Sequence, residues 1–545
     1  MSVVTATILS EGIRIDELQL LSIDIRREVN RISSASLELV DGDAAKREFA
    51  LSNSTDFEPG KAIEIKLRYE SETQDATLFK GPVVRHAVEA NPQGSLLRLD
   101  MKDAAVKLTQ TRKSLVFRDQ TDSDVIRKLI QAAGLKAGKI ERTKLKHPEL
   151  VQYYCSDWDF ILSRADVQGL LVVANDGELS VCKVDLSGPS AYSFELGLSE
   201  IYDFEIEADA AHQYPTVKSS GWSIKDQKAI ESSNAKAFSL SQGNLDGKKL
   251  AQAVGFGAYA LSHPVPVAPE ELQAWADARL VRSRMSMLRG RLSVAGFSGL
   301  ELLDLIEIAG VGERFDGKAL VTGLCHRVDA GGWRTDVQFG LSHRSFCQEE
   351  GIREAPAAGL LPGVSGLQIG IVGDFEDDPE KQLRVKVKLP GVDSTAGPVW
   401  ARLASPDAGK GRGVFFRPEV GDEVVIGFLN EDPRQPVILG ALYSSKNGPP
   451  NVFSELTKDN LKKGIVTKGG TKIGFVDDRK ASVFLETAAS NKVLLDDDKE
   501  AIEISDKHGN KITLNKDGIT LKSAKDLNLD ASGNVVIKGA KVDVK

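Results

Sequence analysis

Short runs in which apolar and polar residues alternate dominate the first 110 residues. Ile63, Ile65 and Leu67 form one such run, and Leu97 and Leu99 belong to another. A period of two sends successive side chains to opposite faces of an extended chain, so these runs predict half-buried β-strands. The N-terminal part of the chain is therefore expected to be mainly β.

Three stretches depart from this alternation and show helical spacing. The first starts near Ser123, the second at Ser156, and the third, 269–289, at Pro269. A serine hydroxyl caps the free N–H groups of a helix start, and proline is tolerated there because those N–H groups have no helical partner. We expect a helix-containing α+β insertion at about residues 111–200 and one long helix after it.

The pattern changes again after residue 353. Residues 354–366 are rich in Ala, Gly and Pro and follow neither period, which predicts a linker. Residues 367–443 contain short alternating runs separated by Gly and Pro, and these predict a small β-barrel. The apolar faces of two of its strands are expected to hold Leu383, Val385, Val387 and Leu389, and Val424, Ile426 and Phe428.

Residues 444–470 are expected to connect this barrel to a C-terminal repeat, residues 471–545. In the repeat, two apolar residues separated by one other residue recur every seven to ten positions. The pairs are Ile473/Phe475, Val483/Leu485, Val493/Leu495, Ile502/Ile504, Ile512/Leu514, Ile519/Leu521, Leu527/Leu529, Val535/Ile537 and Val542/Val544. One apolar pair per short strand, with Asp, Lys, Asn and Gly between the strands, predicts a stacked β-structure.

Such narrow strands bury only one side and leave open edges. Three chains wound about a common axis would remove the edges and bring the pairs into a shared interior. We therefore interpret the repeat as the core of an obligate homotrimer. A single-chain solenoid is the alternative, although turns of this length are short for a wide coil.

Composition adds limits to this picture. The chain has 545 residues, too many for one hydrophobic core, and it has 49 glycines and 4 methionines. Its net charge of -8 argues against binding to a phosphate backbone. Four cysteines without C-x-x-C spacing favour reduced thiols, and neither a signal peptide nor an apolar run of membrane-spanning length is visible. Assembly in the bacterial cytoplasm is expected.

Three groups of residues form distinctive motifs. One is a glycine-rich turn with the strand after it, and another is the core of the long helix. The third and most specific lies in the small barrel. The groups are Gly310, Gly312, Arg314, Phe315, Gly317, Val321, Gly323 and His326; Ala276 to Leu280; and Trp400, Arg402, Ala408 to Gly411, Gly413, Pro418, Val420 to Val424, Phe428, Asp432, Pro433, Pro436, Leu439, Gly440, Leu442 and Tyr443. Together they resemble the Vgr/VgrG family of spike proteins in contractile injection systems.

The resemblance implies a trimeric, mainly β architecture. Residues 1–353 would form a hub of tube-like β-barrels with the α+β insertion, residues 367–443 an OB-fold barrel, and residues 471–545 an intertwined triple-stranded β-helix needle. The implied partners are a hexameric inner-tube protein, baseplate proteins, a PAAR-repeat tip protein and effector cargo. Val542, Val544 and Lys545 would contact the tip protein, and the spike would pierce a target membrane mechanically.

Two departures from some family members are visible. Residues 444–470 leave no room for the lysozyme domain that some phage spikes carry, and the sequence given stops at Lys545, directly after the last pair. We therefore expect a structural spike with no enzymatic domain of its own.

Apparent catalytic motifs are better explained structurally. Gly312 to Lys318 nearly spells a phosphate-binding loop, but Ala319 replaces the hydroxyl residue that binds magnesium, so we expect a turn between strands. Cys325 and His326 are neighbours on a strand and cannot form a dyad, because their side chains point to opposite faces. A core cysteine and a surface histidine are expected.

No catalytic residue, cofactor or protein-borne metal site is predicted. The seven histidines form no H-x-H or H-E-x-x-H motif, although His508 would occur three times around a threefold axis. Asp496, Asp497 and Asp498 are expected to be solvated carboxylates in a needle turn. In residues 367–443, twelve Asp and Glu outnumber nine Lys and Arg, which disfavours nucleic acid.

Two alternatives stay open at this stage. One is a phage baseplate hub or tail spike of the same fold, which the sequence does not separate from a bacterial secretion spike. The other is a β-solenoid enzyme that degrades polysaccharides, which would require a clustered acid and base in the repeats.

Overall fold

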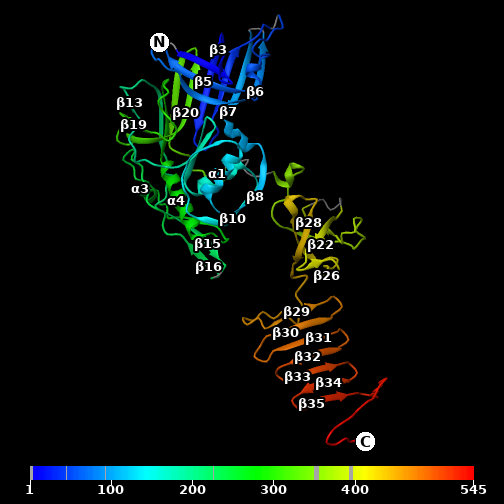
Figure 1. The fold of residues 1–545 in the computed structure, drawn as a ribbon. Coiled ribbons are helices and arrows are strands. Elements are labelled where there is room, and N and C mark those ends of the chain that lie inside the picture. Colours follow the sequence, from blue (N-terminus) through cyan, green and yellow to red (C-terminus); the bar gives the residue numbers. More distant parts are fainter. Residues whose placement is uncertain (1–3, 44–45, 92–93, 225, 349–354, 392–396) are drawn as a thin grey trace. The chain divides into compact units, whose positions relative to one another are not determined.

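The computed structural model describes residues 4–43, 46–91, 94–224, 226–348, 355–391 and 397–545. The chain forms two compact units, Met1–Glu354 and Ala355–Lys545 (Figure 1). Residues 349–354, which include the predicted boundary between hub and linker, lie outside the described residues. The mainly β architecture is confirmed.

A 13-stranded sheet organises the first unit, in the order β14-β18-β21-β20-β3-β4-β7-β6-β5-β1-β2, with β19 pairing β20 and β13 pairing β19. Its strands are β1 (Val4–Ser10), β2 (Ile13–Arg14), β3 (Leu20–Glu28), β4 (Ser34–Val40), β5 (Ala62–Tyr69), β6 (Ala76–Asn91), β7 (Gly94–Lys102), β13 (Tyr192–Glu195), β14 (Ile201–Ala208), β18 (Leu288–Ala295), β19 (Leu305–Ala309), β20 (Gly317–Asp329) and β21 (Gly332–Phe339). The pairing of β3 with β20 joins an N-terminal and a later group of strands, each with its own hydrophobic core.

The alternation in the first 110 residues is confirmed. Ile63, Ile65 and Leu67 lie in β5, Leu97 and Leu99 lie in β7, and all five side chains are fully buried. Their polar neighbours face away from the core, as a period of two requires.

The α+β insertion packs two helices on short strands around a separate core. Its elements are β8 (Arg112–Thr121), α1 (Asp122–Ala132), β9 (Lys136–Ile140), β10 (Lys146–Ser156), α2 (Asp157–Val167), β11 (Leu170–Asn175) and β12 (Glu178–Lys183). The predicted cap at Ser123 is wrong by two residues: Thr121 caps α1 and completes a capping box with Asp124, because the Ser123 hydroxyl instead accepts the N–H of Thr143. The predicted Ser156 cap of α2 is confirmed.

The long helix is α4 (Pro269–Met285), with proline in its first turn as predicted and an end four residues earlier than expected. It packs on a small sheet and shares a core with Val217. The neighbouring elements are α3 (Gly247–Ala253), β15 (Val217–Ser223), β16 (Lys228–Glu231) and β17 (Tyr259–Ser262). Among the helices of the described ranges, none has the length and apolar character needed to cross a bilayer.

Gly296 marks a close approach in the first unit. A Cβ atom there would lie 2.0 Å from the ring of Trp333, which is buried. We expect Gly296→Ala to destabilise the first unit by about 1–3 kcal/mol, because the indole must move within a packed core. The urea midpoint followed by tryptophan fluorescence measures this.

Gly299 supplies the matched control, since a Cβ there would meet Tyr192 at an ordinary 3.6 Å. Gly299→Ala should leave the midpoint unchanged. Equal midpoints for the two variants would show that the Trp333 contact is not tight.

The second unit contains a closed five-stranded barrel in the order β22-β23-β24-β28-β27. Its elements are β22 (Gln368–Val372), β23 (Val385–Lys388), β24 (Val399–Leu403), β27 (Glu423–Phe428) and β28 (Pro436–Ala441), with β25 (Ala408–Gly409) and β26 (Arg412–Gly413) as a separate pair. Within the described residues, the short 3-10 helices are Thr55–Phe57, Ala104–Thr109, Phe346–Gln348, Pro356–Gly359 and Leu429–Glu431.

The barrel core confirms most of its predicted residues and corrects one. Val385, Val387, Val424 and Ile426 are buried, whereas Leu383 is 63% exposed and precedes the strand. The carboxylate of Asp378 accepts the N–H groups of Gln382 and Arg384, so residues before Val385 curl into a turn. These hydrogen bonds to an aspartate stabilise a turn in place of the strand that the alternating pattern predicts.

Seven five-residue strands follow the barrel and pair antiparallel, each with the next, from β29 to β35. They are β29 (Lys462–Val466), β30 (Lys472–Val476), β31 (Ser482–Glu486), β32 (Lys492–Asp496), β33 (Ala501–Ser505), β34 (Lys511–Asn515) and β35 (Gly518–Lys522). They stack as successive rungs (Figure 1). The first rung, β29, lies within the stretch assigned to the connector.

Candidate trimerisation surface

Each strand from β30 to β35 carries one predicted apolar pair at its second and fourth positions. The register aligns these pairs: Ile473 lies opposite Leu485, Val493 opposite Ile504, and Ile512 opposite Leu521. Paired residues of antiparallel strands project to the same side. The structure therefore gathers twelve of the predicted residues on one face, called the pair face below: Ile473, Phe475, Val483, Leu485, Val493, Leu495, Ile502, Ile504, Ile512, Leu514, Ile519 and Leu521.

The pair face has little cover within one chain. Leu485 and Ile504 are each 45% exposed, whereas Leu494 on the opposite face is only 9% exposed. Completing the burial of a half-exposed aliphatic side chain stabilises by roughly 1 kcal/mol, so twelve such side chains offer on the order of 12 kcal/mol per chain. That is enough to offset the entropic cost of association.

The opposite face is closed by its own side chains near the start of the ladder. The ring of Phe484 lies on Gly474, where a Cβ atom would be 2.3 Å from the ring, and Lys492 Nζ lies 5.7 Å from the same ring. Farther along, this face carries Glu503 and Thr513. A face that becomes polar suits solvent, so the pair face is the one that needs a partner.

The turns between rungs hold the predicted solvated carboxylates. Asp496 accepts the N–H groups of Asp498 and Lys499, and these hydrogen bonds, with the Lys499 ammonium, lower the pKa of the Asp496 carboxyl. Asp498 pairs with Lys480 of the preceding turn. The aspartates therefore shape and link the turns. Asp497 and Asp498 are exposed as predicted, whereas the side chain of Asp496 is only 15% exposed. His508 lies exposed in a turn after β33, outside the pair face.

The predicted pattern does not extend as strands to the end of the described chain. No strand forms within residues 523–545, and the remaining predicted residues there are exposed. They are Leu527, Leu529, Val535, Ile537, Val542, Val544 and Lys545. Their alternation is that of strands, so strand partners from other chains would be required to pair them.

The apparent catalytic motifs fall in the first unit. The phosphate-loop-like segment is the connection between the antiparallel strands β19 and β20, which confirms a structural turn. Cys325 and His326 lie on opposite faces of β20, but the predicted exposure is wrong. His326 is 1% exposed and bonds Thr335, whereas Cys325 is only partly buried.

The reason is that β20 turns the face that carries Leu324 and His326 into the core. The face that carries Cys325 is the less buried one. Burial, with the charge of Arg27, lowers the pKa of His326 to about 3, so the imidazole is neutral. Cys325 instead lies beside Asp24, at 3.9 Å.

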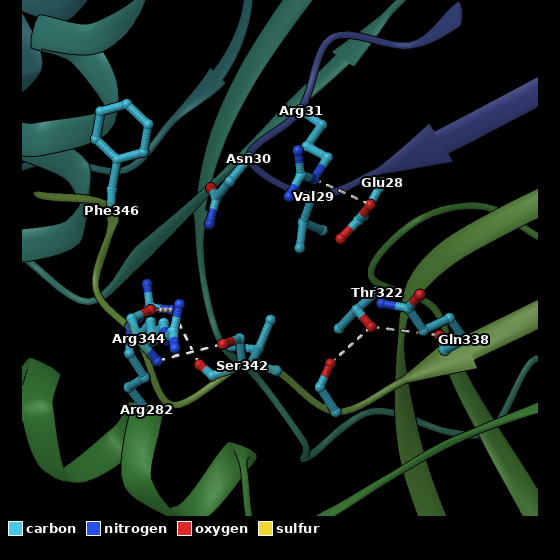
Figure 2. A pocket seen from close by; sticks show the side chains of 12 residues that line it. Glu28, Val29, Asn30, Arg31, Arg282, Thr322, Gln338, Ser342, Arg344 and Phe346 are labelled. Atoms are coloured by element: carbon cyan, nitrogen blue, oxygen red, sulfur yellow. Dashed lines mark hydrogen bonds and ion pairs between the residues drawn. The ribbon is translucent and has the colours of Figure 1, made fainter. Parts of the chain in front are cut away.

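A small pocket of about 90 Å³ lies among β3, β20, β21 and the end of α4 (Figure 2). Glu28 pairs with Arg31, and Arg282 donates to the backbone oxygens of Ser342 and Arg344. The twelve lining residues include neither a cysteine nor a histidine. The side chain of Asn30 accepts the backbone N–H of Val172, and the interactions drawn in Figure 2 join lining residues to one another, which is typical of structural contacts.

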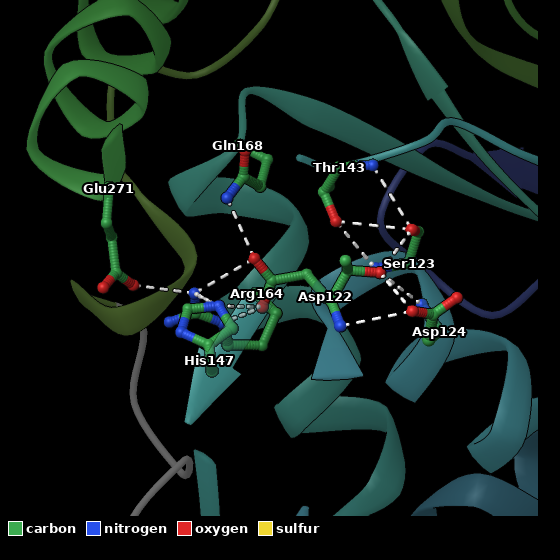
Figure 3. Close-up of polar contacts among 9 residues, drawn as sticks. Asp122, Ser123, Asp124, Thr143, His147, Arg164, Gln168 and Glu271 are labelled. Atoms are coloured by element: carbon green, nitrogen blue, oxygen red, sulfur yellow. Dashed lines mark hydrogen bonds and ion pairs between the residues drawn. The ribbon is translucent and has the colours of Figure 1, made fainter. Parts of the chain in front are cut away.

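A buried ion-pair network connects the insertion to α4 (Figure 3). Asp122 is fully buried and accepts two hydrogen bonds from Arg164, at 2.6 and 3.2 Å, and one from Gln168 at 2.9 Å. Arg164 also donates to Glu271 of α4 at 2.7 Å. Burial alone would lower the pKa of Arg164, but the hydrogen bonds and charges of Asp122 and Glu271 raise it.

Sequence reasoning missed this network because its members are far apart along the chain. It also missed Asp209, His212 and His343, which the fold brings together from two loops. Neither group has a local motif. Only the pairing of the strands that precede these residues could have signalled their proximity.

Family models match nearly the whole chain. Residues 1–330 match the Alg8 N-terminal domain, residues 368–443 the type VI secretion system/phage-baseplate injector OB domain, and residues 482–545 the phage baseplate V C-terminal trimerisation domain. The last match includes the pair face from β31 onward.

Curated relatives include spike proteins of type VI secretion systems. The actin cross-linking toxin VgrG1 of Vibrio cholerae is 24% identical over 66% of this chain and 34% of its own length. The spike protein VgrG2a of Pseudomonas aeruginosa is 31% identical over 21% of this chain and 15% of its own length. The matched part thus spans about a third or less of these relatives.

Among solved structures, a 43 kDa tail protein of prophage MuSo2 from Shewanella oneidensis has a TM-score of 0.47 at 12% identity, covering 63% of this chain and 98% of that one. The E. coli c3393 protein, a component of the type VI secretion system, has a TM-score of 0.39 at 12% identity, covering 80% and 99%.

Proposed function

The chain belongs to the VgrG-type spike proteins of contractile injection systems, with an Alg8-type N-terminal domain, and from this we propose that it forms the homotrimeric central spike of such a machine. In this role it links the inner tube to a membrane-piercing needle. The function is mechanical, and the chain itself carries no reaction.

The observation that carries this proposal is the pair face. It is apolar along six consecutive rungs, has little cover from its own chain, and lies mostly within the stretch matched by a trimerisation domain. Three such faces turned toward one axis would bury all twelve predicted side chains at once. A closed three-chain prism also leaves no free edge from which a needle under load could peel.

The ends of the chain would carry the other contacts. The hub, residues 1–353, would present its β-modules to a hexameric inner tube and to baseplate proteins. Val542, Val544 and Lys545, all exposed, would bind a PAAR-repeat tip protein, and effector cargo would travel on the spike or its tip. Assembly in the bacterial cytoplasm and delivery on firing complete the role.

A phage baseplate hub of the same fold is the second candidate. The OB-domain model that matches residues 368–443 describes secretion systems and phage baseplates together. Genes next to this one distinguish the two: capsid genes indicate a phage, and sheath and tube genes without capsid genes indicate an injection system.

Electron microscopy of particles from the native host tests the proposal. Particles purified from a strain with an affinity-tagged chain should carry the tag at one end of the tube, and Val544→Asp should remove the tip density while leaving the spike. The spike role would be contradicted if the tag were absent from purified particles or distributed along the tube.

A further inference from the structure

Two loops of the first unit leave the main sheet at the same end. Strands β14 and β21 pair antiparallel with opposite edges of β18, so they run in the same direction. His212 lies four residues after the end of β14, and His343 four residues after the end of β21. The topology therefore places both histidines near the start of β18.

The two imidazoles meet a carboxylate there. The rings stack with centroids 3.5 Å apart and planes 9° from parallel, and Nδ1 of His212 lies 2.7 Å from Oδ2 of Asp209. One possible ligand atom from each of the three residues lies within 4.8 Å of the others. Nδ1 of His343 is buried and has no hydrogen-bond partner among the described residues, so this nitrogen is available to bind an ion.

Helix α4 fixes the backbone of both loops. Ser283 Oγ donates to the carbonyl of His212 at 2.7 Å, and Arg279 Nη1 donates to the carbonyl of His343 at 2.9 Å. Both histidines are therefore held by one rigid element, at two positions about one turn apart along the helix. This is the support that a preorganised metal site requires.

Two arginines, Arg289 and Arg344, bring positive charge near the cluster. Arg289 is paired with Glu207, which offsets its repulsion of a bound cation. A charged carboxylate and a neutral imidazole are the forms that bind metals.

We propose that Asp209, His212 and His343 bind a divalent zinc ion. Two imidazoles and one carboxylate are a donor set that suits zinc and its first-row neighbours. The side chains of His212 and Asp209 are 33% and 16% exposed, so water can supply a fourth ligand. Binding turns the stacked rings until their lone pairs converge, and it clips the loop after β14 to the loop after β21.

Calorimetric titration of chelator-treated full-length protein with zinc chloride tests this site. One zinc per chain is expected, and cobalt substituted for zinc should give the visible bands of a four-coordinate ion. His212→Ala and His343→Ala should each weaken zinc binding at least a hundredfold. Zinc should raise the melting temperature of the native protein and not that of these variants.

His263→Ala is the control, because His263 is exposed and belongs to another loop. It should bind zinc as the native protein does. The site is overturned if no zinc binds, or if His212→Ala and His343→Ala, with unchanged metal-free melting, bind it undiminished. If His508→Ala alone abolished zinc binding, the ion would lie on the needle, and the proposed site would also be overturned.

Discussion

A carboxylate placed on the pair face, as in Ile512→Asp, is expected to prevent assembly of the trimer. Ile512 lies in β34 between Ile504 and Leu521 of the neighbouring strands. In a threefold core the substitution brings three carboxylates into one apolar interior, and each buried charge without a partner costs several kcal/mol. A total of more than about 4 kcal/mol per trimer corresponds to at least a thousandfold weaker association.

Light-scattering mass measures the outcome, and Thr520→Asp provides the matched control. Thr520 lies on the adjacent strand β35, on the opposite face of the ladder, and is exposed. The control should keep the mass of the native protein, while Ile512→Asp should approach the mass of one chain. A stable trimer of Ile512→Asp would mean that the pair face does not form a shared core.

The second large effect is expected at the buried ion pair between Asp122 and Arg164. Arg164→Met leaves the fully buried carboxylate of Asp122 without its guanidinium. Gln168 and His147 are then the side chains that still contact it among the described residues. Loss of one partner of a buried pair costs about 3–5 kcal/mol. The transition of the first unit in urea should move to correspondingly lower concentration.

Arg118→Met tests whether burial of the ion pair is the reason for the large loss of stability. Arg118 pairs with Glu149 at 2.8 Å, but the two side chains are 71% and 51% exposed. An exposed pair contributes about 0–1 kcal/mol, so this change should shift the midpoint little. Equal shifts in the two variants would contradict a special role of the buried network. Adding Asp122→Asn to Arg164→Met should recover part of the loss, because it removes the unpaired charge.

The sequence predicted those parts of the fold that depend on local periodicity. The strands around Ile63 and Leu97, the helix at Pro269 and the rungs of the needle follow from alternation, capping and proline chemistry, which act over a few residues. The last three apolar pairs have the same local signal but form no strand here. Their hydrogen-bonding partners are not supplied by the same chain, so local pattern alone does not determine their structure.

The predictions from the sequence were wrong where a local polar contact, or the packing of neighbouring strands, determines the structure. Asp378 turns the chain before Val385 and removes Leu383 from the barrel core, and Thr143 occupies the Ser123 hydroxyl that was predicted to cap α1. His326 is buried because of the strands beside β20. The cluster of Asp209, His212 and His343 depends on strand order, which no short motif encodes.

The most direct test of the spike assignment is the light-scattering mass of the full-length protein beside a version ending at residue 455, which lacks β29 to β35. A full-length mass near three times 58.9 kDa is expected. The shortened protein should have a lower or concentration-dependent mass, because the pair face that holds the chains together is gone. A full-length monomer would contradict the trimeric spike, and a shortened protein that remains a stable trimer would show that the needle does not hold the chains together.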